Sequence, residues 1–384
     1  MTAKDLGYNI RRARITRGLT QKELADRLYL APQTVSKWER GSSVPDALLL
    51  DEIARTLGVD PATLFESREK DEWPLIAIDG GGTKTELVLF TPTGEVLARV
   101  VGGGSNPNSV GVDGATRVLK NGIDELLGGT GQIGGIFAGV AGCGAPEAER
   151  AVREFLKKQY PAYRSRVASD IHNIIGLTKH SDRCIAAIVG TGSAVFGWDG
   201  VTLHRVGGWG YLLDRAGSGY DIGRDAIAYA LECESGVLPY TALAQLIEER
   251  AGGVLSSRLS EIYGGGTGPI AAYSREVFRA MELGDAVARA IVERTADRLA
   301  ELINHVHETY DVGDVAVVSG GIAINEQALG EMIRERLDAG IELVITSTPP
   351  IFGAMRRCAE LYAGGCDYDA FLSEFEESYK KFNV

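Results

Sequence analysis

The chain has 384 residues, of which 45% are hydrophobic and 24% charged, and its formal net charge is −12. This composition is ordinary for a globular protein, and the length suggests two or three domains. No run approaches the roughly 18 apolar residues of a membrane span, and no secretory signal is visible. The five scattered cysteines exclude CxxC metal or disulfide patterns, so we expect a cytoplasmic protein with no membrane partner.

Charge is distributed unevenly along the chain. Residues 1–68 hold 11 basic and 9 acidic residues, whereas the remainder holds 29 basic and 43 acidic residues. A mildly basic head on an acidic body suggests that any contact with nucleic acid lies in the head.

The head, residues 1–68, has the pattern of a bundle of short helices. Thr20 and Glu23 form a capping-box pattern that predicts a helix start, and Pro32 suits the first turn of the next helix. Residues 29–31 are a three-residue turn between these two helices, which is the helix-turn-helix arrangement. The apolar positions expected on the inner helix faces are Leu6, Ile10, Ala13, Leu24, Ala25, Leu28, Val35, Trp38, Ile53, Ala54 and Leu57.

The segment TQKELADRLYLAPQTVSKWERGSSVP resembles the XRE family of phage-repressor-like helix-turn-helix domains. The resemblance implies a double-stranded DNA operator as partner, bound by a homodimer. It places Gln21 near phosphate and Gln33, Ser36 and Lys37 near bases, and Thr34 is also free to face outward. Gln can bind adenine, and Lys can reach guanine or phosphate. A helical interaction domain without DNA contact is the alternative. Residues 69–73 read as a linker.

The body opens with LIAIDGGGTKTELVLF, in which two apolar runs flank a glycine-rich turn. We predict strand, tight turn and strand. Backbone N–H groups without side-chain cover can wrap a phosphate, and threonine hydroxyls can add donors. Asp79, at the strand end, could hold Mg²⁺ through water. An ordinary turn is the alternative reading.

The same design recurs further along the chain. CIAAIVGTGSAVFGW again reads as strand, glycine loop and strand, and VAVVSGGIA reads as a strand that ends in Ser-Gly-Gly. Helix-like segments lie between them, at residues 115–127 and 145–160. The recurrence suggests an internal duplication of one α/β unit, and two such lobes can close a nucleotide between them.

In this order the three loops look like the phosphate-1, phosphate-2 and adenosine motifs of the actin/hexokinase/Hsp70 ATPase superfamily. Within it the body resembles the BadF/BadG/BcrA/BcrD-type ATPases, and most closely the N-acetylglucosamine kinases. The resemblance implies a duplicated ribonuclease-H-like α/β fold with lobes at 74–182 and 183–384, and ATP with Mg²⁺ as cofactors. The residues it assigns to the ATP phosphates are Gly81, Gly82, Thr83, Lys84, Thr191 and Gly192. It places Gly320 and Gly321 at the adenosine, with Gly353 nearby. A ROK-type sugar kinase is disfavoured, because its cysteine-rich zinc motif is missing from the sequence.

The candidate catalytic base lies in VASDIHNIIG. Asp170 follows an apolar stretch, and a carboxylate there could take a proton from a sugar hydroxyl that attacks the γ-phosphate. In the resembled kinases an Asp at this position is that base. A helix N-cap is the alternative, and both roles can coexist. Asn106, in SNPNS, matches a sugar-contacting position, with a plain Asn-Pro turn as its alternative.

A second sugar-binding segment is GGWGYLLDRAGS. Its start matches the family's GGWG, where Gly208 and Trp209 pack against the sugar. The family continues with GDEGS, and this register puts Arg215 where the sugar-binding Asp is expected. Arginine cannot accept a hydrogen bond but can clamp a carboxylate or phosphate. Asp214 could instead shift by one place and substitute.

Three functions remain open. The first is a DNA-binding transcriptional regulator whose kinase-like domain senses a sugar or sugar-phosphate ligand, which the altered sugar loop motivates. The second is an active ATP-dependent amino-sugar kinase that carries a DNA-binding head, which the phosphate loops and Asp170 support. The third is an ATPase that acts on a partner protein. At the C-terminus, the helical spacing of Phe371, Phe375, Tyr379 and Phe382 predicts core packing.

Overall fold

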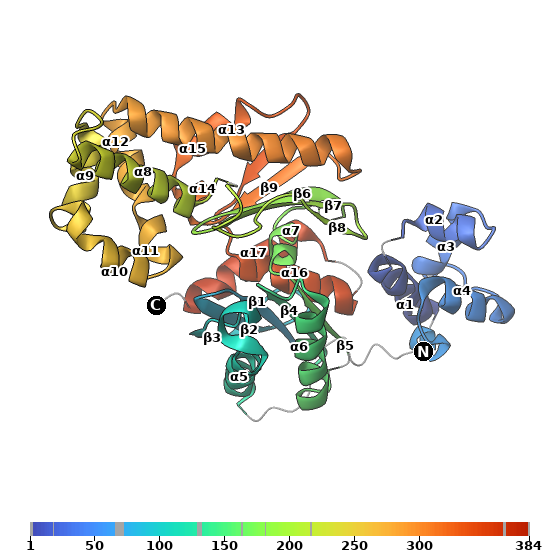
Figure 1. Cartoon of the computed structure of the whole chain (residues 1–384). Helices are drawn as coiled ribbons and strands as arrows, with labels where there is room; N and C mark the ends of the chain where they lie inside the picture. Colours follow the sequence, from blue (N-terminus) through green and yellow to red (C-terminus); the bar gives the residue numbers. More distant parts are fainter. Residues whose placement is uncertain are drawn as a thin grey trace. The chain divides into compact units, whose positions relative to one another are not determined.

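A computed structural model describes residues 3–17, 19–65, 73–128, 133–162, 164–180, 182–215, 217–363 and 366–382. Most of its helices and strands are labelled in Figure 1. The chain forms two compact units: Met1–Lys179 together with Thr348–Val384, and His180–Ser347. The predicted linker lies almost entirely outside the described residues. None of the helices in the described part of the chain combines the length and the apolar character that crossing a bilayer requires.

The head is the predicted helical bundle. Its elements are α1 (Ala3–Thr16), α2 (Gln21–Arg27), α3 (Pro32–Glu39), η1 (Ala47–Leu49), α4 (Leu50–Leu57) and η2 (Pro61–Phe65). The capping box at α2 is confirmed: Glu23 N donates to Thr20 Oγ1 at 3.1 Å, and Thr20 N donates to the Glu23 carboxylate at 2.7 Å. Every residue predicted for the inner helix faces is buried. The spacing of the apolar residues along the sequence therefore predicted correctly which helix faces are buried in this bundle.

The turn between α2 and α3 contains a strained residue. Tyr29 has a φ of 55°, in the left-handed region, and its side chain is 93% exposed. A β-carbon is disfavoured there, whereas glycine adopts this conformation freely. We expect Tyr29→Gly to stabilise the head by about 0.5–1 kcal/mol, after allowance for the more flexible unfolded chain. Hydrogen exchange of α2 and α3 amides would measure this gain. Faster exchange in the variant would show instead that the exposed ring makes a stabilising contact.

The first α/β sheet has the strand order β3-β2-β1-β4-β5. Its strands are β1 (Leu75–Gly80), β2 (Lys84–Phe90), β3 (Val96–Gly103), β4 (Gly135–Val140) and β5 (Arg164–Ala168). β2 is antiparallel to β1 and to β3, whereas β4 is parallel to β1 and β5 is parallel to β4. Apolar runs such as that of β1 are typical of central strands that are buried on both faces.

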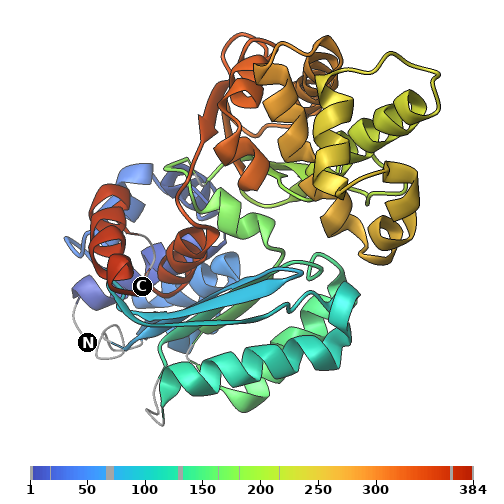
Figure 2. The ribbon, with the colours of Figure 1, turned by 90° about the vertical axis from the view of Figure 1, so that its left-hand side faces the viewer.

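Helices cover both faces of this sheet. They are α5 (Pro107–Leu127), α6 (Pro146–Gln159), α7 (Ile171–Ile175), α16 (Pro350–Ala363) and α17 (Tyr368–Tyr379), followed by η5 (Lys380–Phe382). Figure 2 shows α5 along one face and the red C-terminal helices on the other. Leu119 and Ile123 of α5 pack with Ile76 and Ile78 of β1. The predicted helices 115–127 and 145–160 are confirmed as α5 and α6, although α5 begins earlier and is broken at Gly111.

The C-terminal aromatic residues are core residues, as predicted. Phe371, Phe375 and Tyr379 are buried, and the ring of Phe352 in α16 lies 5.8 Å from that of Phe371 and 5.1 Å from that of Phe375. Phe382 is only partly buried. This packing attaches residues 348–384 to the first compact unit, which differs from the sequence-based lobe at 183–384. The physical reason is that α16 and α17 bury their apolar side chains against the first sheet.

The second sheet repeats the topology of the first. Its strands are β6 (Cys184–Val189), β7 (Ser193–Trp198), β8 (Leu203–Arg205), β9 (Val315–Ser319) and β10 (Glu342–Ile345), in the order β10-β9-β6-β7-β8. β7 is antiparallel to β6 and to β8, whereas β9 is parallel to β6 and β10 is parallel to β9. The predicted duplication is therefore present in the strand order.

The second unit contains nine helical elements within the described residues, some of which pack on the sheet and others on neighbouring helices. They are α8 (Gly219–Glu234), α9 (Ala242–Ala251), η4 (Leu255–Arg258), α10 (Leu259–Gly264), α11 (Thr267–Ala272), α12 (Ser274–Glu282), α13 (Ala286–Thr309), α14 (Gly321–Asn325) and α15 (Gln327–Arg334). Ile185 and Val189 of β6 share one hydrophobic core with Ile222 of α8 and Ile303 of α13. The sheet core thus fixes the strand ends from which the glycine loops emerge.

Candidate functional site

The turn after β1 is closed by backbone hydrogen bonds, and Gly82, Thr83 and Lys84 are exposed. Gly81 N donates to Lys84 O at 2.8 Å, and Ser105 N donates to Gly81 O at 3.0 Å. A Cβ at Gly104 would overlap Gly82 O, so glycine permits this close approach of two loops, while the space around the Cα of Gly82 is open. The predicted phosphate-binding residues Gly81 to Lys84 thus form one hydrogen-bonded turn. A turn of this kind can present N–H groups to an anion.

Asp79 lies at the end of β1 beside this turn. Its Oδ1 accepts a hydrogen bond from Asn173 Nδ2 at 2.6 Å. Burial raises the pKa of the Asp79 carboxyl to about 6; the Asn173 hydrogen bond opposes this rise, and the charge of Asp170 adds to it. Asp79 and Asp170 therefore share one electrostatic environment.

The fit of this site to Mg²⁺ follows from its donors. Proteins commonly bind Mg²⁺ through one or two carboxylates, with waters and substrate phosphates as the other ligands. Asp79 is such a carboxylate, next to a turn that can hold phosphates. No group of three His, Cys, Asp or Glu side chains suited to a metal occurs among the described residues. The residues present therefore fit a metal ion that is bound together with nucleotide phosphates, rather than one bound by protein ligands alone.

Asp170 follows β5, as predicted, and is the N-cap residue of α7. Within the described part of the chain its carboxylate makes no capping hydrogen bond to that helix. Ser169 Oγ donates to Asp170 Oδ1 at 2.9 Å. These contacts do not test the role of Asp170 as a base, which stays a prediction.

His172, two residues further on, is packed in the interior with a side chain that is 7% exposed. Burial lowers the pKa of its imidazole to about 3, and the nearby guanidinium groups of Arg357 and Arg166 add to this effect. A histidine with this pKa is neutral near pH 7. It therefore serves packing rather than proton transfer at that pH.

Asn106 caps α5 rather than standing free in a loop. Its Oδ1 accepts a hydrogen bond from Asn108 N at 2.9 Å. A Cβ at Gly142, in the turn after β4, would overlap the same oxygen. The Asn-Pro turn is therefore present, and the predicted sugar contact would have to use the remaining donors of the amide.

In the second unit, the β6–β7 loop is bonded to the start of α8. Gly190 N donates to Gly192 O at 2.9 Å, which closes the loop. Gly219 N donates to Gly190 O at 2.8 Å, and Tyr220 N donates to Thr191 O at 3.0 Å. The predicted phosphate-2 residues Thr191 and Gly192 are thus held beside the N-terminus of a 16-residue helix. The positive end of a helix dipole favours a bound anion.

The turn from β9 into α14 packs against this loop. Gly320 has a φ of 112°, and a Cβ there would overlap the backbone of Val189 at the end of β6. The structure therefore brings Gly320 and Gly321 together with the β6–β7 loop, and their contact with adenosine stays a prediction. Gly353 has a different environment, because it lies in α16 of the first unit. A Cβ at Gly353 would overlap the backbone oxygen of Asn173, so helix packing alone accounts for a glycine there.

The loop 207–215 is held by its own aspartate. Asp214 Oδ2 accepts hydrogen bonds from Gly208 N and Trp209 N, the latter at 2.9 Å. The Trp209 indole is 59% exposed, and the guanidinium of Arg205 lies 4.6 Å from its ring centroid. Arg215 is exposed. Ala216, which the register aligns with the family's Glu, lies outside the described residues.

The predicted DNA-contacting face of α3 is on the solvent side. Gln33 and Lys37 are exposed and Thr34 and Ser36 half-buried, whereas Val35 is buried. This distribution fits the predicted contacts with bases, which stay predictions.

The head also contains a buried ion pair that the sequence patterns did not indicate. Arg14 Nε donates to Glu39 Oε1 at 2.6 Å, and its terminal Nη2 donates to Glu39 Oε2 at 3.0 Å. Gln21 Nε2 donates to Glu39 Oε2 at 2.7 Å. The side chain of Gln21 is thus partly committed to Glu39. One carboxylate therefore links α1, the start of α2 and the end of α3.

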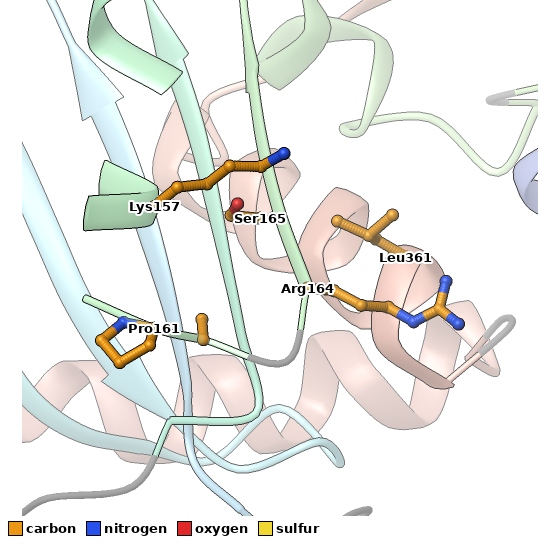
Figure 3. A pocket seen from close by; sticks show the side chains of 6 residues that line it. Lys157, Pro161, Arg164, Ser165 and Leu361 are labelled. Atoms are coloured by element: carbon orange, nitrogen blue, oxygen red, sulfur yellow. The ribbon is translucent and has the colours of Figure 1, made fainter. Parts of the chain in front are cut away.

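A hollow of about 540 Å³ lies elsewhere on the first unit. It is lined by the end of α6, the segment between α6 and β5, β5 itself and α16, through Lys157, Pro161, Ala162, Arg164, Ser165 and Leu361 (Figure 3). None of the predicted site residues lines it. The chemistry described above therefore belongs to the strand-end loops rather than to this hollow.

The head is a helix-turn-helix domain of the DNA-binding type. The body has two sheets of like topology with glycine loops at their strand ends, and it is sugar-kinase-like. The chain belongs to the BadF/BadG/BcrA/BcrD ATPase family, whose family model matches residues 76–355. A helix-turn-helix model matches residues 10–64.

Individual proteins are similar to the body of this chain, and one solved structure covers nearly the whole chain. The "N-acetylmuramic acid/N-acetylglucosamine kinase" of Clostridium acetobutylicum is 28% identical over 304 residues, which cover 73% of this chain and 96% of that protein. The structure of a ROK family glucokinase from Streptomyces griseus has a TM-score of 0.51 at 16% identity and covers 75% of this chain and 99% of its own. A ROK family transcriptional regulator has a TM-score of 0.50 at 15% identity, with 97% and 99% coverage. These two structures show that the fold is that of the actin/hexokinase class.

Proposed function

We propose that this protein is a DNA-binding transcriptional regulator whose body binds ATP and a sugar-type effector. The observation that carries the proposal is the altered loop 207–215. Asp214 is bonded to the backbone of its own loop, and the neighbouring exposed side chain is that of Arg215. Arg215 offers only donors, so it suits an anionic group better than a neutral sugar. The effector is therefore a phosphorylated or acidic sugar.

Two likenesses support this assignment. The Clostridium acetobutylicum relative carries N-acetylmuramic acid, an acidic sugar, in its name. The structure that covers 97% of this chain is that of a transcriptional regulator. XRE-type heads bind paired half-sites, so we propose a homodimer on the operator.

Operator binding tests this function directly. The operator is selected from a random DNA library with the full chain, and its dissociation constant is measured with and without ATP and each member of a panel of neutral, acidic and phosphorylated amino sugars. We expect at least a several-fold change with one acidic or phosphorylated sugar. An operator affinity that no member of the panel alters would refute the sensing role.

An active amino-sugar kinase is the second candidate, and the proximity of Asp79 and Asp170 favours it. In this function Asp170 would accept the proton of the attacking sugar hydroxyl, and the glycine loops would hold the phosphates. A bound Mg²⁺ would neutralise phosphate charge. ADP release over the same sugar panel, compared between the natural chain and Asp170→Ala, discriminates between the candidates. Turnover that Asp170→Ala abolishes supports the kinase, and no turnover with any sugar rejects it.

The role of Arg215 gives a prediction at a single position. We expect Arg215→Asp to weaken the binding of an acidic or phosphorylated sugar about 10-fold or more, because a charge-assisted hydrogen bond is lost and repulsion replaces it. Binding of neutral amino sugars should strengthen. Isothermal calorimetry measures both affinities, and Arg289→Asp, at an exposed position of α13, is the control. Unchanged selectivity would mean that the register of this loop is wrong.

A further inference from the structure

Asn173 occupies an unusual place beside the proposed nucleotide site. Its side chain is completely buried in the short helix α7. Its Nδ2 donates to Asp79 Oδ1 at 2.6 Å and to Gly139 O at 3.2 Å. One amide group thus joins the carboxylate at the end of β1 to the backbone at the end of β4.

The orientation of this amide is determined by its neighbours. Both partners, the Asp79 carboxylate and the Gly139 carbonyl, can only accept hydrogen bonds near neutral pH. The reversed amide would point its oxygen at two acceptors in a buried site, which is strongly unfavourable. Donation from nitrogen is therefore the arrangement that the local chemistry requires.

Two glycines hold Asn173 in this position. A Cβ at Gly139 would overlap the side-chain amide of Asn173, and a Cβ at Gly353 would overlap its backbone oxygen. β4 therefore confines the side chain and α16 confines the main chain. A residue that is fixed from two sides can fix its hydrogen-bond partner in turn.

We propose that Asn173 is the positioning residue for Asp79 in the binding of a metal–nucleotide complex. By holding Oδ1, it leaves Oδ2 for the ligand, and Oδ2 makes no hydrogen bond within the described residues. The same short helix carries Asp170 at its N-terminus, so one element places both carboxylates. This inference rests on the ATP site of the proposed function, and it adds a residue outside the glycine loops to that site.

Electron paramagnetic resonance of Mn²⁺ with a non-hydrolysable ATP analogue tests the proposal on the full chain. We expect Asn173→Ala and Asn173→Asp to weaken Mn²⁺–nucleotide binding about 10- to 100-fold, the usual effect of removing a residue that orients a metal ligand. Binding of the metal-free nucleotide should change far less. The matched control is Asn304→Asp, because Asn304 is a partly buried amide whose Nδ2 donates to Arg336 O and whose Oδ1 accepts from Asp338 N.

Each result has a defined meaning. Unchanged Mn²⁺–nucleotide affinity in both Asn173 variants would overturn the proposal, as would an equal loss with and without metal, since that indicates a structural role only. If the natural chain binds no metal–nucleotide complex, the ATP site fails and the inference fails with it. The operator assay is independent of both results, so failure of the regulatory function is recognised separately.

Discussion

Glu39→Ala is expected to unfold the head and to abolish operator binding. Glu39 accepts hydrogen bonds from Arg14 at both carboxylate oxygens and from Gln21 at one of them. The side chains of Arg14 and Glu39 are only 10% and 2% exposed. Without Glu39 the guanidinium of Arg14 keeps its bond to Leu19 O but loses its counter-charge. Breaking a buried pair in this way costs about 3–5 kcal/mol, which is comparable to the whole stability of a small helical domain.

Hydrogen exchange of the α1, α2 and α3 amides measures this loss, and a DNA-binding assay measures its consequence. Glu52→Ala, at an exposed position in α4, is the control and should change stability by less than about 0.5 kcal/mol. Replacing both members of the pair, as in Arg14→Met with Glu39→Leu, should recover most of the stability. A loss below about 1 kcal/mol for Glu39→Ala would show that the pair is not the link between the three helices.

Asp79→Asn is expected to stabilise the fold near neutral pH while it weakens metal–nucleotide binding. Burial raises the Asp79 pKa from 3.8 to about 6. The unfolded chain therefore releases this proton at a lower pH than the folded chain does, so stability falls as the pH rises from about 4 to 6. Above about pH 6 the loss of folding stability caused by the buried Asp79 charge is constant, at about 3 kcal/mol for a pKa shift of this size. Asparagine removes the charge but can still accept the Asn173 hydrogen bond.

Denaturant unfolding at pH 7.5 and near pH 4 measures the effect. We expect Asp79→Asn to be more stable than the natural chain by up to about 3 kcal/mol at pH 7.5, and nearly equal to it near pH 4. Asp113→Asn, at an exposed position of α5, is the control. Equal stability at pH 7.5 would contradict the buried-charge account, and undiminished Mn²⁺–nucleotide affinity would remove Asp79 from the site.

Local patterns were sufficient for most of the fold. The capping box at Thr20, the inner faces of the head helices and the strand–loop–strand repeats depend on neighbours close in sequence, and all are present. The attachment of residues 348–384 to the first unit was not predictable in this way. It depends on contacts such as Cys358 Sγ to Ile76 O, which join residues 282 positions apart.

The candidate site was predictable to a similar extent. Glycines at strand ends indicated the loops, because few other features need a backbone without side chains. The packing requirement for glycine at position 353 could not be read from the sequence, since it comes from α7, far away in the chain. Asn173 had a faint signal, namely its place three residues after Asp170 on one helix, which puts both on one face. Its partner Asp79 lies 94 residues earlier, and no local pattern connects them.

The closed loop at Asp214 has a consequence for how a ligand binds. With Gly208 and Gly210 at φ values of 82° and 104° and the Asp214 carboxylate across the loop, Trp209 is presented before any ligand arrives. The conformational entropy of ordering this segment is therefore lost during folding rather than during binding. Because the free loop already has its binding conformation, differences in affinity at this loop are expected to come mainly from the dissociation rate of the complex.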